Sequence, residues 1–493
     1  RASMSGRRDF IKSTLGISAL MLAEPLARPV EQFLGQDSKT TRPWRRVYGK
    51  VTSDGKPLAG VAVSDSATVT VTAADGSYEL WAGKNEKFVF ITNPAGHAIA
   101  TNPTGTARFY EPLTDSSEIE VNFSLTTSGD DTQHSFFLLA DPQPLDMDDI
   151  ALFNQETIPD LIEMAEGRKH LFGVACGDIV FNDLKLFPEY EKAISRTKIP
   201  FYQVLGNHDT DHSSATDETS AETFNRHFGP DYYSFNKGAV HYVVMNDVFW
   251  FGHYIGYIDQ KQLDWLQQDL ALVKPGTTVV VFTHIPPFNT QHIRYKKEPS
   301  KSEIVVNRKL LYSLLKPYKS YIVTGHMHES DYLEEDGIEI HVVGAVCGAW
   351  WTAPTCFDGT PKGYGIYEVN GSELKWKYKS TGKPSTYQIS IQKRGSMKDK
   401  PDEIMANIWG WDKYCKVFWH EDGKPMGEME RRTGMDPESI YLFEGDKKPT
   451  KHTWVEPAIT DHLFFAKPSK GAKMVVVEFF NRWGERFTAK HQL

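Results

Sequence analysis

Five short segments of the sequence carry side chains that could bind metal ions, and each follows an apolar stretch. They are Asp141-Pro142-Gln143, Gly177-Asp178, Gly206-Asn207-His208-Asp209, His284 and Gly325-His326-Met327-His328. Carboxylate, amide and imidazole groups are the donors that divalent cations prefer. One Asp after a strand is most often a turn residue or a helix cap, so a single segment is weak evidence. Five such segments in one chain favour a site for divalent cations.

Apolar strands are expected to position these segments. The expected strands cover residues 136–140, 171–175, 201–205, 240–245, 279–283 and 321–324. They alternate with helical patterns such as residues 259–273, which predicts an α/β domain over residues 134–348. Because ligand sites of α/β proteins gather beyond the carboxyl ends of strands, the five segments should lie close together.

Two β-rich regions flank this domain, so the 493 residues divide into three expected domains. Residues 44–129 show short alternating strands with turn signals at Asp54-Gly55 and Asp75-Gly76, which predicts a β-sandwich. Alternation returns in residues 363–493, where we expect a second β-rich domain. Its many Trp and Tyr residues could form a core, an interface or a binding surface, and the core is favoured.

The composition is that of a folded globular protein, with 40% hydrophobic and 24% charged residues. The formal net charge is -9, and Lys and Arg are dispersed, which argues against a nucleic-acid partner. The four cysteines, Cys176, Cys347, Cys356 and Cys415, form no CxxC pair and are too few for a disulfide framework. A Cys347–Cys356 disulfide and buried free thiols both remain open.

Residues 1–30 have the features of an export signal. Arg7-Arg8-Asp9-Phe10 resembles the twin-arginine motif, and the apolar stretch from Leu15 to Ala23 is too short to span a membrane. We therefore expect an exported, periplasmic protein without a transmembrane segment. The alternative is an N-terminal amphipathic helix with two chance arginines.

The order of the five segments resembles the signature of the calcineurin-like metallophosphoesterase family. Asp231-Tyr232-Tyr233-Ser234-Phe235 and Gln262-Leu263-Asp264-Trp265-Leu266 resemble further stretches of that family. The resemblance implies an αββα sandwich, in which two mixed β-sheets are flanked by helices. The module over residues 44–129 resembles transthyretin-like domains, and both flanking modules resemble those of exported bacterial members.

The resemblance also implies roles for individual residues. Metal one would be bound by Asp141, Gln143, Asp178 and His328, and metal two by Asp178, Asn207, His284 and His326. His208 would donate a proton or a hydrogen bond to the leaving oxygen. Asp209 could orient the His208 ring or cap a helix. The implied cofactors are two divalent ions, with Mn²⁺ favoured and Mg²⁺, Fe and Zn²⁺ open.

Gln143 is the one departure, because the family usually has His at this position. A subset that resembles ADP-ribose and CDP-alcohol diphosphatases also has Gln there. The leading interpretation is hydrolysis of a phosphomonoester or phosphodiester of small size; the alternatives are a diphosphatase acting on a nucleotide derivative and a non-catalytic envelope binding protein. The oligomeric state is not indicated.

Further side chains near the motifs could shape a pocket: His212, His253, Tyr254, Trp350 and Trp351. The two tryptophans are expected to pack against the C-terminal module, although pocket walls are often aromatic. His212 lies in a polar stretch and is expected to be solvated.

Overall fold

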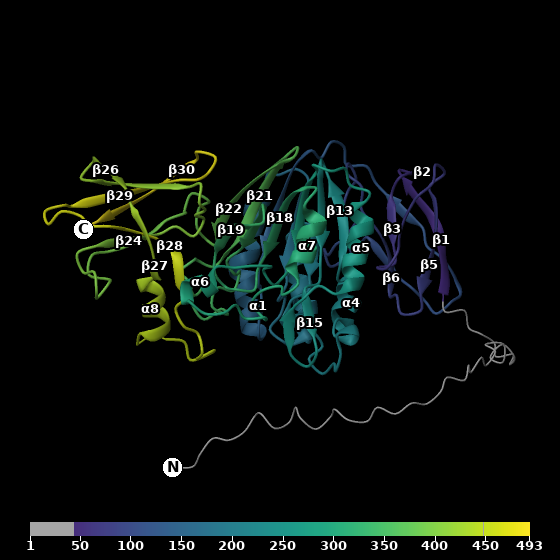
Figure 1. Cartoon of the computed structure of the whole chain (residues 1–493), viewed down its shortest axis with the longest axis horizontal. Helices are drawn as coiled ribbons and strands as arrows, with labels where there is room; N and C mark the ends of the chain where they lie inside the picture. Colours follow the sequence, from purple (N-terminus) through teal and green to yellow (C-terminus); the bar gives the residue numbers. More distant parts are fainter. Residues whose placement is uncertain (1–43, 447) are drawn as a thin grey trace, which may run out of the picture. The chain divides into compact units, whose positions relative to one another are not determined.

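The computed structural model describes residues 44–446 and 448–493 (Figure 1). The twin-arginine motif lies outside the described residues, so the export signal stays a prediction. Among the helices of the described residues, none is long and apolar enough to cross a membrane.

The N-terminal module consists of two small sheets. The first contains β1 (Trp44–Ser53), β2 (Lys56–Pro57), β5 (Ser77–Gly83), β8 (Glu118–Glu120) and β9 (Phe123–Leu125). The second contains β3 (Ala62–Ser64), β4 (Val69–Val71), β6 (Phe88–Ile91) and β7 (Tyr110–Pro112). Buried apolar residues of this module belong to the same core cluster as those of the following domain, and the rings of Phe109 and Tyr233 are 4.4 Å apart. The module is therefore packed directly onto its neighbour.

Two mixed sheets form the central domain, as expected. The first has the strand order β12-β11-β10-β21-β22, with β10 (Gln133–Leu139), β11 (Leu171–Cys176), β12 (Phe201–Val204), β21 (Gly363–Asn370) and β22 (Glu373–Ser380). The second has the order β13-β14-β17-β18-β20-β19, with β13 (Tyr233–Lys237), β14 (Val240–Val244), β17 (Thr278–Phe282), β18 (Lys319–Thr324), β19 (Asp331–Glu335) and β20 (Ile338–Val342). β10, β11 and β12 are parallel to one another, and so are β14, β17, β18 and β20.

Strand β10 shows why the sequence gives this layered arrangement. Its side chains alternate between two core clusters: Phe136 and Leu138 belong to one cluster, and Phe137 and Leu139 to the other. Such alternation follows from the two-residue period of a strand, and both faces are buried because layers cover both. Phe136 stacks on Tyr367 of β21 with ring centroids 4.5 Å apart.

Helices cover the outer sides of the two sheets. The clusters place α1 (Met147–Leu152), α2 (Ile158–Ala165), α3 (Phe187–Ser195) and α4 (Glu222–Phe228) with the first sheet, and α5 (Gln260–Leu270) and α7 (Arg308–Leu315) with the second. Figure 1 shows α5 and α7 beside the strands of the second sheet. α5 begins after Asp259, whose carboxylate accepts a hydrogen bond from the Gln262 N–H, so this Asp is an N-cap. Two short elements complete the domain, the ribbon of β15 (Val248–Trp250) and β16 (Tyr254–Gly256) and helix α6 (Gln291–Tyr295).

The boundary between the central and C-terminal domains differs from the expected one. Residues 363–380, which we assigned to the C-terminal module, form β21 and β22 and pair with β10 in the first central sheet. Alternating apolar residues predict a strand but do not tell which sheet it joins. Here β21, which is distant in sequence from β10, joins the first central sheet beside it.

The C-terminal module contains two four-stranded sheets and a helix. One sheet has β23 (Ser390–Gln392), β24 (Ile404–Asn407), β28 (Ile459–Ala466) and β27 (Glu430–Met435), and the other has β26 (Lys424–Glu428), β25 (Lys416–Glu421), β29 (Met474–Phe480) and β30 (Arg486–Gln492). Both contribute to one apolar core. The helix is α8 (Pro437–Glu444), and β28 contacts α6 of the central domain.

Candidate metal centre

Five strands end next to the predicted metal-binding segments. β10 leads to Asp141, β11 to Asp178, β12 to Asn207, β17 to His284 and β18 to His326. The first three strands belong to one sheet and the last two to the other, so the ends of two facing sheets meet at this place.

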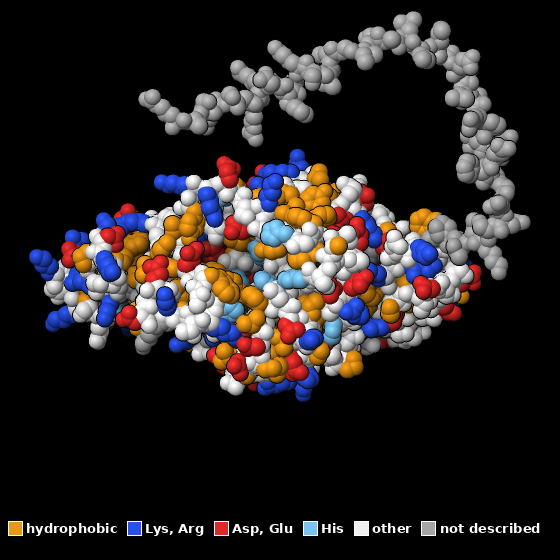
Figure 2. Space-filling view, turned by 90° about the horizontal axis from the view of Figure 1, so that it is seen from below, with side chains coloured by type: hydrophobic (Ala, Val, Ile, Leu, Met, Phe, Trp, Pro, Cys, Tyr) orange, Lys and Arg blue, Asp and Glu red, His pale blue; other side chains and the backbone are white. Residues whose placement is uncertain are grey.

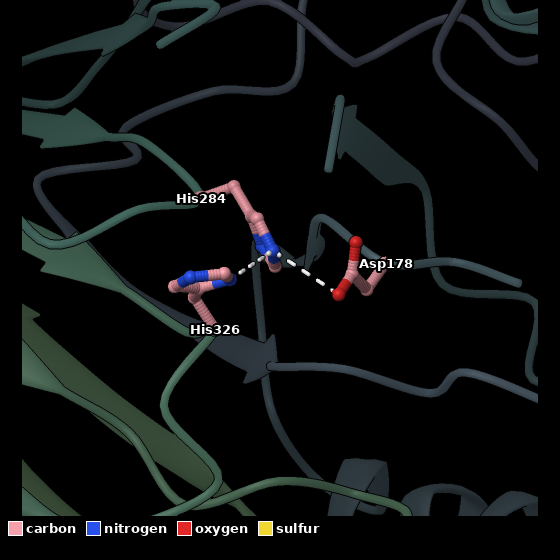
Figure 3. Close-up of side chains that lie close together, drawn as sticks. All are labelled: Asp178, His284 and His326. Carbon is pink, nitrogen blue, oxygen red and sulfur yellow. Dashed lines mark hydrogen bonds and ion pairs between the residues drawn. The ribbon is translucent and has the colours of Figure 1, made fainter. Parts of the chain in front are cut away.

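One group of donor atoms surrounds His284 (Figure 3). His284 Nε2 lies 3.3 Å from Asp178 Oδ2, 3.2 Å from Asn207 Oδ1 and 3.2 Å from His326 Nδ1. Two atoms that bind the same ion at about 2.1 Å lie about 3.0–3.4 Å apart, so these spacings suit a shared cation. Asp178, His284 and His326 are the one group of His, Cys, Asp or Glu with metal-site geometry in the described part of the chain.

A second group of side chains adjoins Asp178. His328 Nε2 lies 3.6 Å from Asp141 Oδ1, and Gln143 Nε2 donates a hydrogen bond to Asp178 Oδ2 at 3.3 Å. An exchange of the Gln143 amide nitrogen and oxygen would turn its Oε1 to the same place. Asp141 Oδ1 is buried and has no hydrogen-bond partner among the described residues. An unpaired buried carboxylate oxygen is costly unless a cation balances it, so this atom fits a metal ligand.

Three glycines permit the close approach of these groups. A Cβ atom on Gly177 would lie 2.2 Å from His284 Nδ1, and one on Gly325 would lie 2.6 Å from Asp141 Oδ2. A Cβ atom on Gly206 would lie 2.0 Å from Asp178 N. A side chain at any of these three positions would therefore clash with a donor residue, so only glycine fits there.

The backbone is strained where the donors are attached. The φ angles are positive at five donor residues: Asp141 (48°), Gln143 (45°), Asp178 (49°), His326 (73°) and His328 (50°). Residues other than glycine adopt this conformation at a cost of about 1–2 kcal/mol each. Such strain gathers at functional sites, where it serves to aim particular side chains.

Backbone carbonyls fix the tautomer of all three histidines. His284 Nδ1 donates to Cys176 O (2.9 Å), His326 Nε2 to Ser302 O (2.8 Å), and His328 Nδ1 to Gly348 O (2.6 Å). In the neutral ring the other nitrogen carries the lone pair. For His284 and His328 this is Nε2, which faces Asp178 and Asp141, and for His326 it is Nδ1, which faces His284 Nε2. A metal-binding histidine commonly has this arrangement.

Burial and neighbouring charges set the protonation of the site. Burial lowers the pKa of His326 to about 3 and that of His328 to about 4, which keeps both rings neutral. Burial raises the pKa of Asp141 to about 8. Burial would also raise the pKa of Asp178, but His284 and His208 hold it below its usual range. A bound cation would favour the ionised form of both carboxylates.

Three sequence profiles match successive parts of the chain. Residues 134–330 match the calcineurin-like phosphoesterase domain, residues 45–128 match the N-terminal region of calcineurin-like phosphoesterases, and residues 340–487 match their C-terminal region. The chain belongs to the calcineurin-like phosphoesterase family. Members of this family use divalent metal ions, in agreement with the donor set described above.

Curated relatives match part of this phosphoesterase. The serine/threonine-protein phosphatase CPPED1 of Danio rerio is 29% identical over 196 residues, which cover 36% of this chain and 60% of that protein. Purple acid phosphatase 15 of Arabidopsis thaliana is 31% identical over 144 residues, which cover 27% of this chain and 25% of that protein. The chain thus spans less than two thirds of the length of either relative. The structure of purple acid phosphatase PPD1 from Lupinus luteus aligns with a TM-score of 0.39 and 12% identity, over 65% of this chain and 67% of that one.

His208 lies at the edge of the donor atoms. Its Nε2 is 4.0 Å from Asp178 Oδ2, and its ring stacks on Phe181 at 4.5 Å. The Nδ1 atom lies 2.5 Å from Asn182 Oδ1. Burial lowers the pKa of this imidazole.

Asp209 does not orient the His208 ring, contrary to one of the two predicted roles. Its carboxylate is buried and accepts hydrogen bonds from the N–H groups of Gly206 (2.9 Å), Ile179 (3.1 Å) and Val180 (3.1 Å). It therefore joins the loop after β11 to the loop after β12. The residue that hydrogen-bonds the His208 ring is Asn182, which was not among the predicted site residues. Its place four residues after Asp178 is the only sign of this role in the sequence.

The remaining aromatic candidates have different fates. His212 is not simply solvated, because its ring stacks on Trp250 at 4.8 Å and its Nε2 donates to Asn207 O. Trp351 is buried and donates to Pro142 O (2.8 Å), whereas Trp350 lies 4.9 Å from the His328 ring. Tyr254 lines the cavity described below. His253 is exposed and does not line this cavity.

All four cysteines are free thiols, so Cys347 and Cys356 do not form a disulfide.

A cavity of about 340 Å³ opens over the donor atoms. Its floor includes Gln143, Asp178, Asn207, His326 and His328, and His208 lies at its side. Figure 2 shows histidine side chains gathered near the middle of one face of the molecule. Residues 454 and 456–458 of the C-terminal module form part of the wall. None of these residues was among the predicted site residues.

Proposed function

We propose that this protein is a metal-dependent hydrolase of small phosphoesters. The observation that carries the proposal is the convergence of seven donor side chains, five of which line a cavity that His208 also lines. Asp141, one of the two donors buried behind them, has an unpaired oxygen. The family assignment and the phosphatase relatives support the same reaction.

We assign some of the side chains to metal binding and His208 to proton transfer. Asp141, Gln143, Asp178 and His328 would hold one divalent cation, and Asp178, Asn207, His284 and His326 a second. When bound, the two cations would lower the pKa of a water molecule and neutralise charge on the phosphate. Asn182 Oδ1 accepts a hydrogen bond from His208 Nδ1, so Nε2 is the ring nitrogen left for the substrate, and in the imidazolium form it would donate a proton to the leaving oxygen. Asp209 keeps the two donor loops together through its three backbone hydrogen bonds.

The test is hydrolysis by purified protein reconstituted with Mn²⁺. We expect cleavage of p-nitrophenyl phosphate or of bis(p-nitrophenyl) phosphate, which separates monoesterase from diesterase activity. His208→Ala should keep its metal content and lose at least about 100-fold in kcat. His420→Ala, on β25 in the C-terminal module, is the matched control and should retain activity. Metal binding without hydrolysis of either compound would instead favour a binding protein.

We further propose that the protein is exported and that Mn²⁺ is its preferred metal. Arg7 and Arg8 support the first part, and the two amide side chains among the donors support the second, because Mn²⁺ accepts oxygen-rich shells readily. Replacement of both arginines by Lys should retain the protein in the cytoplasm, which cell fractionation would detect. Secretion at the normal level would contradict the export proposal.

A further inference from the structure

The wall of the cavity beyond the donor atoms is rich in aromatic side chains. Trp350 and Trp454 approach each other with ring centroids 5.5 Å apart, and Trp350 lies 5.2 Å from Phe357. Tyr254 and Tyr295 line other parts of the same cavity. Trp454 is 56% exposed, which leaves part of its surface open to a ligand.

The C-terminal segment that carries Trp454 is held firmly against the central domain. Val455 is buried in a small apolar cluster with Ala349 and Phe443, and the Ala458 N–H donates to Phe357 O at 2.9 Å. Contacts within the protein therefore hold this part of the wall in place without a bound substrate.

The charged groups of the wall are all negative. Glu303 and Glu456 line the cavity, and neither forms an ion pair within the described residues. No Lys or Arg is among the described residues that line the cavity. Two cations lie nearby. The guanidinium of Arg294 is already engaged, because it pairs with Glu329 at 2.6 Å and donates to Ile459 O. Lys297 Nζ lies 5.3 Å from the centroid of the Tyr295 ring, so the aromatic faces open to a ligand are those of Trp350 and Trp454.

Aromatic faces next to unpaired carboxylates attract organic cations. The π-faces of Trp and Tyr bind ammonium groups, and a carboxylate adds Coulomb attraction. A second phosphate or a carboxylate on the substrate would meet like charge in this wall, and like charge across a contact disfavours binding.

We infer that the substrate is the phosphomonoester of an alcohol that carries an ammonium group. The inference rests on the proposed function. In the reaction, a water oxygen forms a new bond to phosphorus as the bond from phosphorus to the alcohol oxygen breaks. The products are inorganic phosphate and the free alcohol, which takes one proton and keeps its ammonium charge between Trp350, Trp454 and Glu456.

Three phosphomonoesters of similar size test the inference. Phosphocholine is the cationic probe, 3,3-dimethylbutyl phosphate is its neutral isostere, and 3-phosphoglycerate carries an extra carboxylate. With the Mn²⁺-loaded full chain we expect kcat/KM for phosphocholine to exceed that for the isostere by about tenfold, a ratio within the range of cation–π and charge attraction. The acidic wall should make 3-phosphoglycerate the poorest of the three.

Variants of the wall show whether it causes the preference. Glu456→Gln, Glu303→Gln and Trp454→Leu should each reduce the phosphocholine-to-isostere ratio, mainly through a higher KM for phosphocholine. Glu428→Gln, an exposed position on β26, is the matched control and should keep the ratio. Equal kcat/KM for phosphocholine and the isostere, with clear hydrolysis of p-nitrophenyl phosphate, would overturn the inference and leave the proposed function intact. Absence of hydrolysis of every phosphoester would overturn the proposed function itself.

Discussion

Gly206→Ala is the substitution whose effect on the site can be worked out most directly. The added Cβ atom would lie 2.0 Å from Asp178 N and 2.4 Å from Asp178 Oδ1, and real Cβ contacts are essentially never below 3.0 Å. The two loops must therefore separate by about 1 Å, and a misplacement of that size can cost about 100-fold in rate. Overpacking should also lower the free energy of unfolding by about 1–3 kcal/mol.

The assay combines metal content per chain, kcat/KM for p-nitrophenyl phosphate and unfolding by urea. We expect Gly206→Ala to lose metal, because Asp178 belongs to both groups of donors. Two control substitutions separate the possible causes. Gly173→Ala places a Cβ 2.2 Å from the Phe201 ring, which overpacks the core away from the donors, whereas Gly471→Ala has no atom within 4 Å.

The two control variants should each differ from Gly206→Ala. Gly173→Ala should lose stability but keep its metal content and most of its kcat/KM, and Gly471→Ala should resemble the unsubstituted protein in all three measurements. If Gly206→Ala kept full metal content and full kcat/KM, the close contact between Gly206 and Asp178 would not position the donors, and our account of the site would be wrong.

Three other predictions follow from single contacts. Asn182→Gly removes the hydrogen-bond partner of His208 Nδ1, and glycine adopts the positive φ of 65° at this position without strain. The kcat should fall about tenfold at unchanged KM, and Asn182→Asp should restore it. Gln143→His should raise the affinity for Zn²⁺ relative to Mn²⁺ in titrations of chelator-treated protein, and identical metal profiles would mean that Gln143 is not a ligand. Burial lowers the pKa of His134 from 6.5 to about 4, so His134 is protonated at a higher pH in the unfolded chain than in the folded protein. The free energy of unfolding therefore falls as the pH drops from 6.5 to 4. Over this range the unfolding free energy of the unsubstituted protein should drop by up to about 3 kcal/mol more than that of His134→Gln, and parallel pH curves would refute the assignment.

The sequence was sufficient for features that depend on local pattern. Strands were predicted because buried residues such as Phe136 to Leu139 are apolar without interruption, and their ends are marked by the first polar residue, such as Asp141. Glycines at Gly177 and Gly206 mark close approaches between loops. Since the parallel strands all end at one place, the donors could be expected to meet without knowledge of the strand order.

Features that depend on contacts between distant segments could not be predicted. The carboxylate of Asp209 turns to the backbone of Ile179 and Val180, about thirty residues earlier, and no local pattern reveals this direction. Strand β21 fills a place next to β10 that could equally have been taken by another alternating segment. The cavity wall from the C-terminal module depends on how two domains pack, which the pattern of either domain alone does not contain.

The contacts of the C-terminal module indicate that it is part of the site. Asp358 Oδ2 accepts hydrogen bonds from the Ser330 N–H (2.8 Å) and from His462 Nε2 (2.9 Å) of β28, so a C-terminal strand is tied to the loop that follows His328. Arg294 makes a second tie, because it bonds both Glu329 and Ile459 O. Both ties are buried, and the loss of one partner would leave the other unpaired at a cost of several kcal/mol. The loop that holds His328 and the wall that holds Trp454 therefore depend on the same set of interdomain contacts, which couples the position of the metal donors to the shape of the substrate cavity.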